Sequence, residues 1–389
     1  MTIEDRIRQD APAVKNMKKV NTLLIIFTVL FPLVALGQEE AAKKPPTLRF
    51  VPGGVPVDAD SSLVFITNRS VLALDKDTEE TSTFFQNSPT RTLKYGSYSY
   101  RFLGSKHKEG AFDDTVKRYR SKRLTEAEAL GDPKLTVNEP EVLVMVHGYN
   151  TNFDDSVKQA VLFKHDLYTG HQKTMKFFDF KVFSWASKGN PIVYTNERMD
   201  IKYNAPPLAE FISKITRVRG QEKVNFIIHS MGNDVFLTAI ERLDASGELK
   251  NLRFGRVILA ASDVSQKHFQ TAVPKLIERS RKVVQYISAR DEALGYSKKV
   301  NVLAGGTRAG AIVLPIKGLE VVDCEEVTDP KDRNAHSYFA SSRLVLDDIA
   351  GLFQDDSGMK TPDERHPDRF EKRKLDDGFE YWAFKGTAP

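Results

Sequence analysis

The sequence contains little cysteine, since Cys324 is the single cysteine among 389 residues. One cysteine cannot form an intramolecular disulfide, and no pairing of cysteine with histidine has the spacing of a structural zinc site. We therefore expect neither a disulfide framework nor a metal. Low cysteine content is compatible with a reducing compartment and with a bacterial periplasm, so it does not decide where the protein acts.

The sequence also lacks a large excess of charge of one sign, because 57 basic residues stand against 52 acidic ones and the net charge is +5. Its one basic cluster, residues 117–123, includes polar residues and suggests a solvated helix. Nucleic-acid binding requires basic residues clustered on one face and is not expected. A hydrophobic content of 41% excludes a wholly disordered chain and provides for a sizeable core.

Long hydrophobic runs are scarce, which excludes a membrane protein with several spans. The one candidate run, residues 23–36, follows Lys18-Lys19 and ends at Ala35-Leu36-Gly37. A positive segment, a short apolar run and small residues before the cut are typical of a signal peptide. We expect cleavage after Gly37 and a periplasmic or secreted protein. Because the segment before the run is long, a start at Met17 and an uncleaved membrane anchor remain alternatives.

The remainder of the chain divides by composition into four stretches. A linker rich in Glu, Ala, Lys and Pro covers residues 38–60, and a β-containing lead-in with a polar surface loop at 75–90 covers residues 61–135. Strands and helices alternate over residues 136–353, and a charged tail follows over residues 354–389. The alternating stretch is the candidate catalytic core.

The apolar runs of the core predict strands that alternate with helical patterns. Such alternation is typical of an α/β protein with a doubly wound, mostly parallel sheet covered on both faces. Ligands of these sheets bind beyond the carboxyl ends of the strands, so we examine the residues that follow each strand. The predicted strands cover residues 63–67, 95–102, 142–146, 177–185, 224–228, 257–261, 283–287 and 319–327, and the predicted helices cover 154–168, 207–218, 233–243, 266–279 and 338–353.

A candidate nucleophile follows the strand at 224–228. The run His229-Ser230-Met231-Gly232-Asn233 stands between this strand and a predicted helix. A serine on a sharp turn between strand and helix forms a nucleophile elbow, which raises the hydroxyl above the edge of the sheet. The usual pattern is G-x-S-x-G, and Ile228 holds the position of its first glycine here. The alternative role for Ser230 is an ordinary N-cap.

A catalytic serine needs a base, which in α/β-hydrolases follows the serine and the acid in chain order. Three histidines follow Ser230. His268 lies within a helical pattern and His366 in the charged tail, whereas His336 follows the last core strand directly before a helix. We therefore predict His336 as the base, with a solvent-exposed loop histidine as the alternative.

Two aspartates follow strands in a position suited to the acid. Asp291 lies after the second strand beyond the nucleophile, which is the commoner position, and Asp263 lies after the first. We prefer Asp291 and expect Asp263 to support the site or to be the alternative acid. Either aspartate could instead be the N-cap of the helix that follows it.

The oxyanion hole requires two backbone N–H donors. Met231 follows the serine at the start of a helix and supplies the first. The run His147-Gly148-Tyr149-Asn150 follows the strand at 142–146, and the N–H of Tyr149 or Asn150 supplies the second. Gly148 permits a close backbone approach, and we expect His147 to orient this loop rather than to act as the base.

Eight segments together resemble an uncharacterised bacterial family of α/β-hydrolases, catalogued as the domain of unknown function number nine hundred. The resemblance extends over roughly residues 60–353 and implies the α/β-hydrolase fold with a Ser230, Asp291 and His336 triad. Ser262 is a departure, since a proline often precedes the aspartate in this family. The segments are Val64–Arg69, Leu93–Gly96, His147–Asn150, Phe183–Ala186, His229–Asn233, Ile258–Asp263, Ser288–Leu294 and His336–Phe339.

These observations predict an exported serine hydrolase, similar to esterases and lipases, that cleaves an ester or other acyl bond without a cofactor. The expected substrate is a small or lipid-like ester, and contact with a membrane is expected only if the signal segment is uncleaved. Residues 183–186 and the insertion 187–207 are candidates for the substrate pocket. The alternatives are a catalytically silent binding protein of the cell envelope, and an interaction protein whose tail aromatics at 379–384 bind a partner.

Overall fold

The computed structural model describes residues 61–386, apart from 72–84, 103–115, 132–139, 172–174, 176–177, 189–193, 301–305, 330–334, 356 and 359. The predicted signal peptide and the linker at 38–60 lie outside the described residues. Most of the expected surface loop at 75–90 does so as well.

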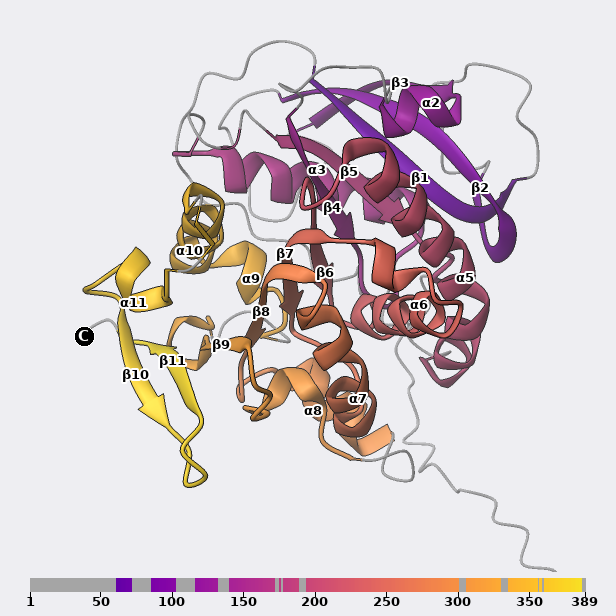
Figure 1. Ribbon diagram of the computed structural model, residues 1–389. Helices are drawn as coiled ribbons and strands as arrows, with labels where there is room; N and C mark the ends of the chain where they lie inside the picture. The colour runs from indigo at the N-terminus through magenta and orange to yellow at the C-terminus, as the bar shows by residue number, and fades with distance from the viewer. Residues whose placement is uncertain are drawn as a thin grey trace, which may run out of the picture. The chain divides into compact units, whose positions relative to one another are not determined.

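One sheet of eleven strands runs through the described part of the chain, in the order β10-β11-β9-β8-β7-β6-β4-β5-β1-β2-β3 (Figure 1). Neighbouring strands from β11 across to β1 are parallel, whereas β10, β2 and β3 pair antiparallel at the two edges. The predicted doubly wound, mostly parallel sheet is therefore confirmed. The strands are β1 (Ser61–Val71), β2 (Phe85–Phe102), β3 (Val116–Leu124), β4 (Glu141–Val146), β5 (Phe178–Ser184), β6 (Val224–His229), β7 (Phe254–Ala260), β8 (Ser280–Ile287), β9 (Leu319–Asp323), β10 (Phe370–Lys374) and β11 (Glu380–Phe384).

Helices cover both faces of the sheet, so its central strands are buried and read as nearly continuous apolar runs. Apolar side chains of α5, α6 and α7 belong to the core on one face of the sheet, and those of α3, α9 and α10 belong to the core on the other. The helices are α2 (Glu126–Leu130), α3 (Phe153–Tyr168), α5 (Tyr194–Arg219), α6 (Gly232–Ala245), α7 (Gln266–Ile277), α8 (Glu292–Val300), α9 (Tyr338–Ser341), α10 (Arg343–Gln354) and α11 (Pro362–Arg365).

Local signals account for several helix starts. The side chain of Asn152 accepts the backbone N–H of Asp155 at 2.9 Å and caps α3, and Ser265 caps α7 in the same way. The helix predicted at 338–353 is interrupted at Ser342, which separates α9 from α10. The helix predicted at 207–218 begins earlier, because α5 starts at Tyr194.

The basic cluster at 117–123 is a strand, and the predicted helix is wrong. These residues belong to β3, which pairs antiparallel with β2 and places Ser121 opposite Tyr98. Basic residues alternate with Tyr119 and Ser121 in the sequence, a period of two that fits a strand better than a helix. Lysine and arginine on an edge strand also discourage pairing with another chain.

Two predicted boundaries also differ from the structure. Strand β2 begins at Phe85, so the end of the expected loop at 75–90 is extended backbone that pairs with β1. The strand predicted at 319–327 stops at Asp323 and is followed by a short 3₁₀ helix, Glu325–Val327.

The segment predicted as a charged tail, residues 354–389, is folded over most of its described length. Strand β11 pairs parallel with β9 and β10 closes the hairpin, which extends the sheet. Trp382 and Phe384 are buried against the core beneath α10. The aromatics expected as an alternative docking segment therefore pack on the core of the same chain.

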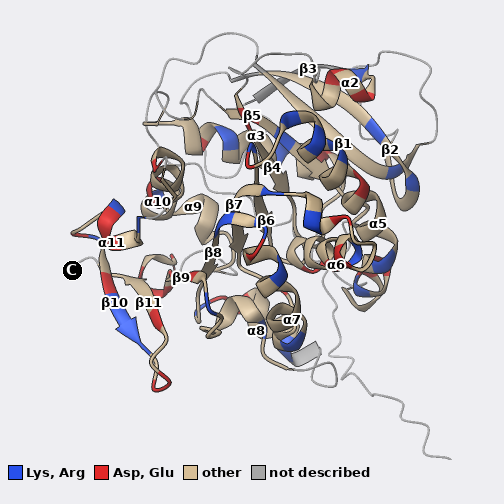
Figure 2. Cartoon of the chain, viewed as in Figure 1, with Lys and Arg blue, Asp and Glu red and all other residues tan. Residues whose placement is uncertain are grey.

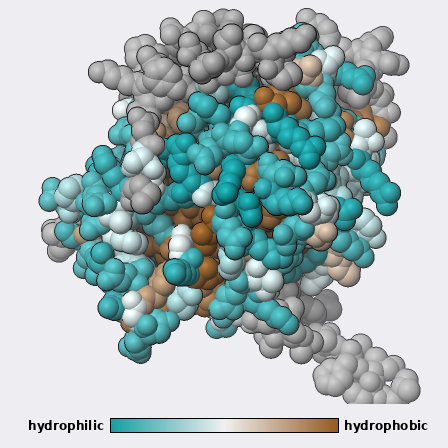
Figure 3. Space-filling view, viewed as in Figure 1, coloured by the Kyte–Doolittle hydropathy of each residue, from teal (hydrophilic) through white to brown (hydrophobic). Residues whose placement is uncertain are grey.

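The exposed surface carries both signs of charge, interspersed over the helices and the β10–β11 hairpin (Figure 2). The face seen in Figure 3 is largely hydrophilic, with limited apolar areas between the polar side chains. Among the described residues, none of the helices combines the length and the apolar character needed to cross a membrane.

Candidate active site

The site lies where the strand order reverses. Strand β4 has β5 on one side and β6 on the other, because the chain runs from β4 to β5 and the next connection returns past β4 to β6. At such a point the loops that follow neighbouring parallel strands separate and leave a crevice at the carboxyl ends. The loops after β4 and β6 carry residues 147–151 and the run around Ser230, which the sequence predicted as oxyanion loop and nucleophile elbow.

Ser230 occupies a sharp turn between β6 and α6. Its φ of 54° is in the left-handed region, which a serine adopts only where the surroundings enforce it. Its N–H donates to the carbonyl of Ala260 at 3.1 Å, and its carbonyl accepts the N–H groups of Asn233 and Asp263. The N-cap of α6 is Met231, and no side chain caps this helix. Ser230 is therefore not an ordinary N-cap, and its backbone has the geometry of an elbow.

Gly232 explains why the elbow needs a glycine two residues after the serine. A Cβ atom at this position would stand 2.3 Å from the carbonyl oxygen of His147, closer than side-chain carbons approach. The start of α6 therefore touches the backbone of the loop after β4. This contact places the N–H of Met231, at the positive end of the α6 dipole, beside the predicted oxyanion loop.

Asp291 and His336, predicted as acid and base, meet in the structure. Nδ1 of His336 lies 2.7 Å from Oδ2 of Asp291, and both side chains are buried. The other carboxylate oxygen of Asp291 accepts the N–H of Leu294 at 3.0 Å. Burial raises the pKa of Asp291, and the facing imidazole opposes that shift. A buried carboxylate that accepts from Nδ1 leaves Nε2 as the nitrogen able to take a proton from a nucleophile.

The other two candidate histidines lie elsewhere. Nδ1 of His268 is 2.7 Å from Oδ1 of Asp234 on α6, and Nε2 of His366 is 3.8 Å from Oδ1 of Asp348. Among the described residues, their ion-pair partners belong to helices α6 and α10 and include neither Asp291 nor Asp263.

His229 connects the elbow to His336, a contact that the sequence did not predict. Its ring centroid is 4.7 Å from that of His336, and its Nε2 lies 3.4 Å from the carbonyl oxygen of His336. The ring of Phe339 also stacks on His229, with centroids 4.5 Å apart. Burial lowers the pKa of His229 well below its usual range, so the ring packs as a neutral group. The position directly before the nucleophile was the signal in the sequence.

Asp263, the alternative acid, is occupied by other partners. Its Oδ2 accepts the Tyr194 hydroxyl at 2.7 Å, and its Oδ1 accepts from Ser297 Oγ at 2.6 Å and faces Nε of Arg308 at 3.0 Å. Arg308 is fully buried, so this pair balances a buried charge. The geometry favours Asp291 as the partner of the base and Asp263 as a support of the neighbouring loop.

His147 lies within the loop that it was expected to orient. Its ring stacks on Trp185 at 5.2 Å, its Nδ1 is 2.9 Å from the carbonyl oxygen of Gly148, and its Nε2 is 3.2 Å from that of Trp185. Burial lowers the pKa of His147 to about 3, so the ring is neutral and donates to one of these carbonyls. Trp185 returns a hydrogen bond from Nε1 to the carbonyl of His147 at 2.7 Å.

The two N–H groups considered for the second oxyanion donor differ in their surroundings. Asn150 has a φ of 57°, and its N–H donates to the buried carboxylate of Glu197. This leaves Tyr149 as the candidate of the loop. The Tyr149 ring packs edge-on against Tyr194 with centroids 5.1 Å apart.

The insertion at 187–207, expected to wall the substrate pocket, is only partly described. From Tyr194 onward it forms the first half of α5. Tyr194 is buried among the partners of Asp263, whereas Tyr203 is 54% exposed. The two tyrosines therefore do not line one common wall.

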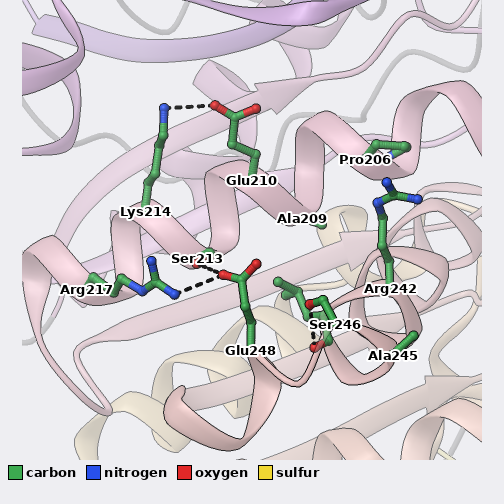
Figure 4. A pocket seen from close by; sticks show the side chains of 11 residues that line it. Pro206, Ala209, Glu210, Ser213, Lys214, Arg217, Arg242, Ala245, Ser246 and Glu248 are labelled. Atoms are coloured by element: carbon green, nitrogen blue, oxygen red, sulfur yellow. Dashed lines mark hydrogen bonds and ion pairs between the residues drawn. The ribbon is translucent and has the colours of Figure 1, made fainter.

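A pocket of about 540 Å³ lies between α5 and the end of α6 (Figure 4). Arg242 and Ala245 in the last turn of α6 line it. They follow Gly232 by ten or more residues, so they lie roughly 15 Å along the helix from the elbow. Pro206, which belongs to the insertion at 187–207, lines this pocket, whereas Ser230, Asp291 and His336 do not.

Comparison with known proteins identifies a family. A family model described as "Alpha/beta hydrolase of unknown function (DUF900)" matches residues 125–352 of the chain. The uncharacterized protein alr1448 of Nostoc sp. (strain PCC 7120) is 29% identical over 124 residues. That match covers 26% of this chain and 31% of the relative, so the chain spans about a third of this curated relative.

Solved structures with similarity to the chain include a lipase, a predicted hydrolase and a lipase-esterase related protein. Lipase B of Aspergillus fumigatus is 14% identical, with 57% of this chain and 53% of that chain covered and a TM-score of 0.33. A predicted CIB-like hydrolase of Thermoplasma acidophilum is 14% identical, covering 66% and 94%, with a TM-score of 0.30. A lipase-esterase related protein of Clostridium acetobutylicum is 15% identical, covering 58% and 96%, with a TM-score of 0.29. These likenesses are too weak to indicate a substrate.

Proposed function

The chain belongs to DUF900, a family of α/β-hydrolases of unknown function, and from this premise we propose that it is a serine hydrolase of carboxylic esters or related acyl bonds. The observation that carries the proposal is the elbow geometry of Ser230 together with a buried pair of Asp291 and His336, which His229 contacts from the residue before the serine. These residues come from three different loops of the sheet. An arrangement of a strained serine, a base and an orienting carboxylate is the arrangement that nucleophilic acyl transfer requires.

The proposed reaction has two halves. In the first, Oγ of Ser230 attacks the carbonyl carbon of the substrate while Nε2 of His336 takes the hydroxyl proton. The tetrahedral intermediate collapses to an acyl-enzyme, and His336 gives the proton to the departing alcohol. In the second half, His336 takes a proton from water, the resulting hydroxide attacks the acyl-enzyme, and the acid leaves as Ser230 regains its proton.

Backbone dipoles stabilise the negative charge of the intermediate. The N–H of Met231 lies at the start of α6, where the helix dipole favours a developing oxyanion. The N–H of Tyr149 is the proposed second donor from the loop after β4. The carboxylate of Asp291 keeps the ring of His336 in the required tautomer and stabilises it when it is protonated. The proposed chemistry requires no cofactor.

The proposed setting follows from the N-terminal sequence. Lys18-Lys19 and the apolar run at 23–36 support export by a signal peptide that is cut after Gly37. We propose a periplasmic or secreted enzyme that acts on a small or lipid-like ester, with membrane attachment if the segment is retained.

The direct test replaces the nucleophile. Ser230→Ala is expected to abolish both hydrolysis of a short p-nitrophenyl ester and covalent labelling by a fluorophosphonate, with the circular dichroism spectrum unchanged. Ser246→Ala, which changes a serine beside the distant pocket, is the matched control and should retain both activities. Labelling or turnover that survives in Ser230→Ala would refute the mechanism. A wild-type protein inert to a panel of esters and to the probe would favour the binding-protein alternative.

A further inference from the structure

We propose that Glu197 is a positioning residue that fixes the oxyanion loop, residues 147–151, in its working conformation. The inference rests on the proposed function, because it assigns the loop a role in acyl transfer. Glu197 is fully buried in the first turn of α5, far in sequence from the loop that it contacts. The sequence placed Glu197 within the insertion 187–207, a candidate for the substrate pocket, but pointed to no role for this residue.

The carboxylate of Glu197 receives donors from two loops. Its Oε2 accepts Oγ of Ser187 at 2.7 Å, and its Oε1 accepts the N–H of Lys188 at 2.6 Å. The N–H of Asn150 also donates to this carboxylate. Ser187 Oγ in turn accepts the N–H of Thr151 at 3.0 Å. One side chain therefore ties the loop after β4 to the loop after β5 through backbone N–H groups on both.

These contacts fix the peptide groups on both sides of Tyr149. The peptide group between Tyr149 and Asn150 is held at its N–H by Glu197 and at its carbonyl by Oγ1 of Thr151, 3.1 Å away. The carbonyl oxygen of the peptide group between Gly148 and Tyr149 lies 2.9 Å from Nδ1 of His147. Because a trans peptide is planar, the N–H of Tyr149 points opposite to that carbonyl. The direction of the Tyr149 N–H is therefore determined by the neighbouring residues and not by the substrate.

A buried carboxylate near an oxyanion would oppose catalysis unless its charge were balanced. Arg69, also fully buried, supplies the balance. Its guanidinium donates to the carbonyl of Ser187 at 2.8 Å and to that of Thr151 at 2.8 Å, and its charge attracts Glu197. Burial lowers the pKa of Arg69 to about 9, which leaves it charged at neutral pH. The same two loops are thus held by a cation on one side and an anion on the other.

The first turn of α5 is itself fixed from the side of the nucleophile. Tyr194 donates to Asp263 at 2.7 Å, and Arg198 pairs with Asp234 of α6 at 2.9 Å. Asp263 donates its N–H to the carbonyl of Ser230. Glu197 lies between Tyr194 and Arg198 in the chain, so these contacts fix its position relative to the elbow. This arrangement couples the position of the oxyanion loop to that of the nucleophile.

The experiment compares Glu197→Gln and Glu197→Asp with Glu248→Gln, a control that changes a carboxylate at the distant pocket. Active sites are first counted with the fluorophosphonate probe, and kcat and KM for a p-nitrophenyl ester are then given per active site. A glutamine presents one acceptor oxygen where the carboxylate has two. We expect Glu197→Gln to lower kcat by about tenfold or more with KM changed less than about twofold, since one lost oxyanion donor costs roughly 10²–10³ in kcat. Glu197→Asp should recover part of the loss, and Glu248→Gln should match the wild type.

Hydrogen exchange of backbone amides in residues 147–151 supplies a readout that needs no activity. Faster exchange of this segment in Glu197→Gln, with exchange of β6 and β7 unchanged, supports positioning. Unchanged kcat per active site, an equal loss in kcat and in 1/KM, or unchanged exchange would overturn it. If Glu197→Gln does not fold, the same measurements on Glu197→Asp decide. A wild type inert to ester and probe would refute the proposed function alone, because the exchange result would still report on the loop.

Discussion

A Cβ atom at Gly148 would stand 2.8 Å from the Cβ atom of Ser230, so the oxyanion loop and the nucleophile leave no room for a methyl group between them. The same Cβ would lie 3.1 Å from Nδ1 of His229. The loop after β4 and the elbow after β6 are therefore in direct backbone contact. This contact explains why the residue after His147 is a glycine.

Gly148→Ala is expected to lower kcat of ester hydrolysis by about tenfold or more, because the loop must move away from Ser230 and one oxyanion donor with it. The change should destabilise the protein by only about 1–3 kcal/mol, the usual cost of an added carbon in a packed site. Steady-state kinetics and thermal unfolding measure the two effects. Gly295→Ala is the matched control, since no heavy atom outside its own helix lies within 4 Å of the new Cβ. Wild-type kcat in Gly148→Ala would contradict the contact.

The two candidate acids are expected to fail in different ways. Asp291→Asn should lower kcat by roughly 10³–10⁴ with a near-normal melting temperature, because the imidazole of His336 loses its orienting carboxylate. Asp263→Asn leaves the buried Arg308 without a countercharge, so its main effect should be a loss of about 3–5 kcal/mol in the free energy of unfolding. Measurement of kcat and of thermal unfolding on both variants separates the roles. A larger loss of kcat in Asp263→Asn than in Asp291→Asn would identify Asp263 as the acid.

Asp166 is expected to make the protein less stable at alkaline pH. Burial raises the pKa of this carboxyl on α3 from 3.8 to about 8. Between pH 3.8 and pH 8 the folded state keeps a proton on Asp166 that the unfolded state has released. The stabilisation that this proton gives the folded state is complete below pH 3.8 and is lost as pH rises through 8. Asp166→Asn mimics the protonated form. Relative to the wild type, it should raise the melting temperature more at pH 8 than at pH 5. An equal change at both values would contradict the shift.

Asp347 on α10 is expected to change the pH dependence of stability in the opposite direction to Asp166. Although burial acts against it, hydrogen bonds from His171 and Arg369 lower the pKa of Asp347 to about 2. A lowered folded-state pKa stabilises the protein above the ordinary value of 3.8, and that stabilisation is lost as pH falls toward 2. Asp347→Asn should therefore lower the melting temperature at pH 5 and pH 8 alike. Thermal unfolding at both pH values, beside Asp166→Asn, gives the comparison.

The C-terminal segment is expected to be required for stability. Arg365 is buried and pairs with Asp348 at 2.9 Å and with Glu320 at 2.8 Å. Arg365→Ala should cost about 3–5 kcal/mol, because it leaves Asp348 uncompensated in the core. Arg373→Ala, on the exposed strand β10, should change stability by less than about 1 kcal/mol. Urea unfolding of the two variants tests the contrast, and equal stabilities would contradict the structural role of Arg365.

Export and cleavage after Gly37 can be examined on the protein isolated from cells. A mature chain that begins at Gln38 and fractionates as a soluble envelope or secreted protein is expected, because the apolar run of 14 residues reaches only about 21 Å as a helix. N-terminal sequencing or intact mass measures the start. A chain that begins at Met1 or Met17 and pellets with membranes would establish the anchored form.

The candidate site shows how far local sequence information reaches. The strand before Ser230, the turn and the start of α6 are contiguous residues, so the elbow was recognisable without any tertiary contact. The chain order of Ser230, Asp291 and His336 followed from counting strands. His229 and Glu197 were missed, because their contacts join residues whose separation in the chain hides their proximity in space.

The sequence by itself determined the alternation of strands and helices, and with it a parallel sheet whose loops gather at one edge. Apolar runs and turn residues are local properties, so they can be read along the chain. Only the tertiary structure decided which carboxylate meets His336, that Glu197 and Arg69 hold the loop beside Ser230, and that residues 370–384 extend the sheet. Each of these contacts depends on the order and register of strands that are distant in the chain. Strand order and register follow from burial and charge pairing over the whole core, so no single segment encodes them.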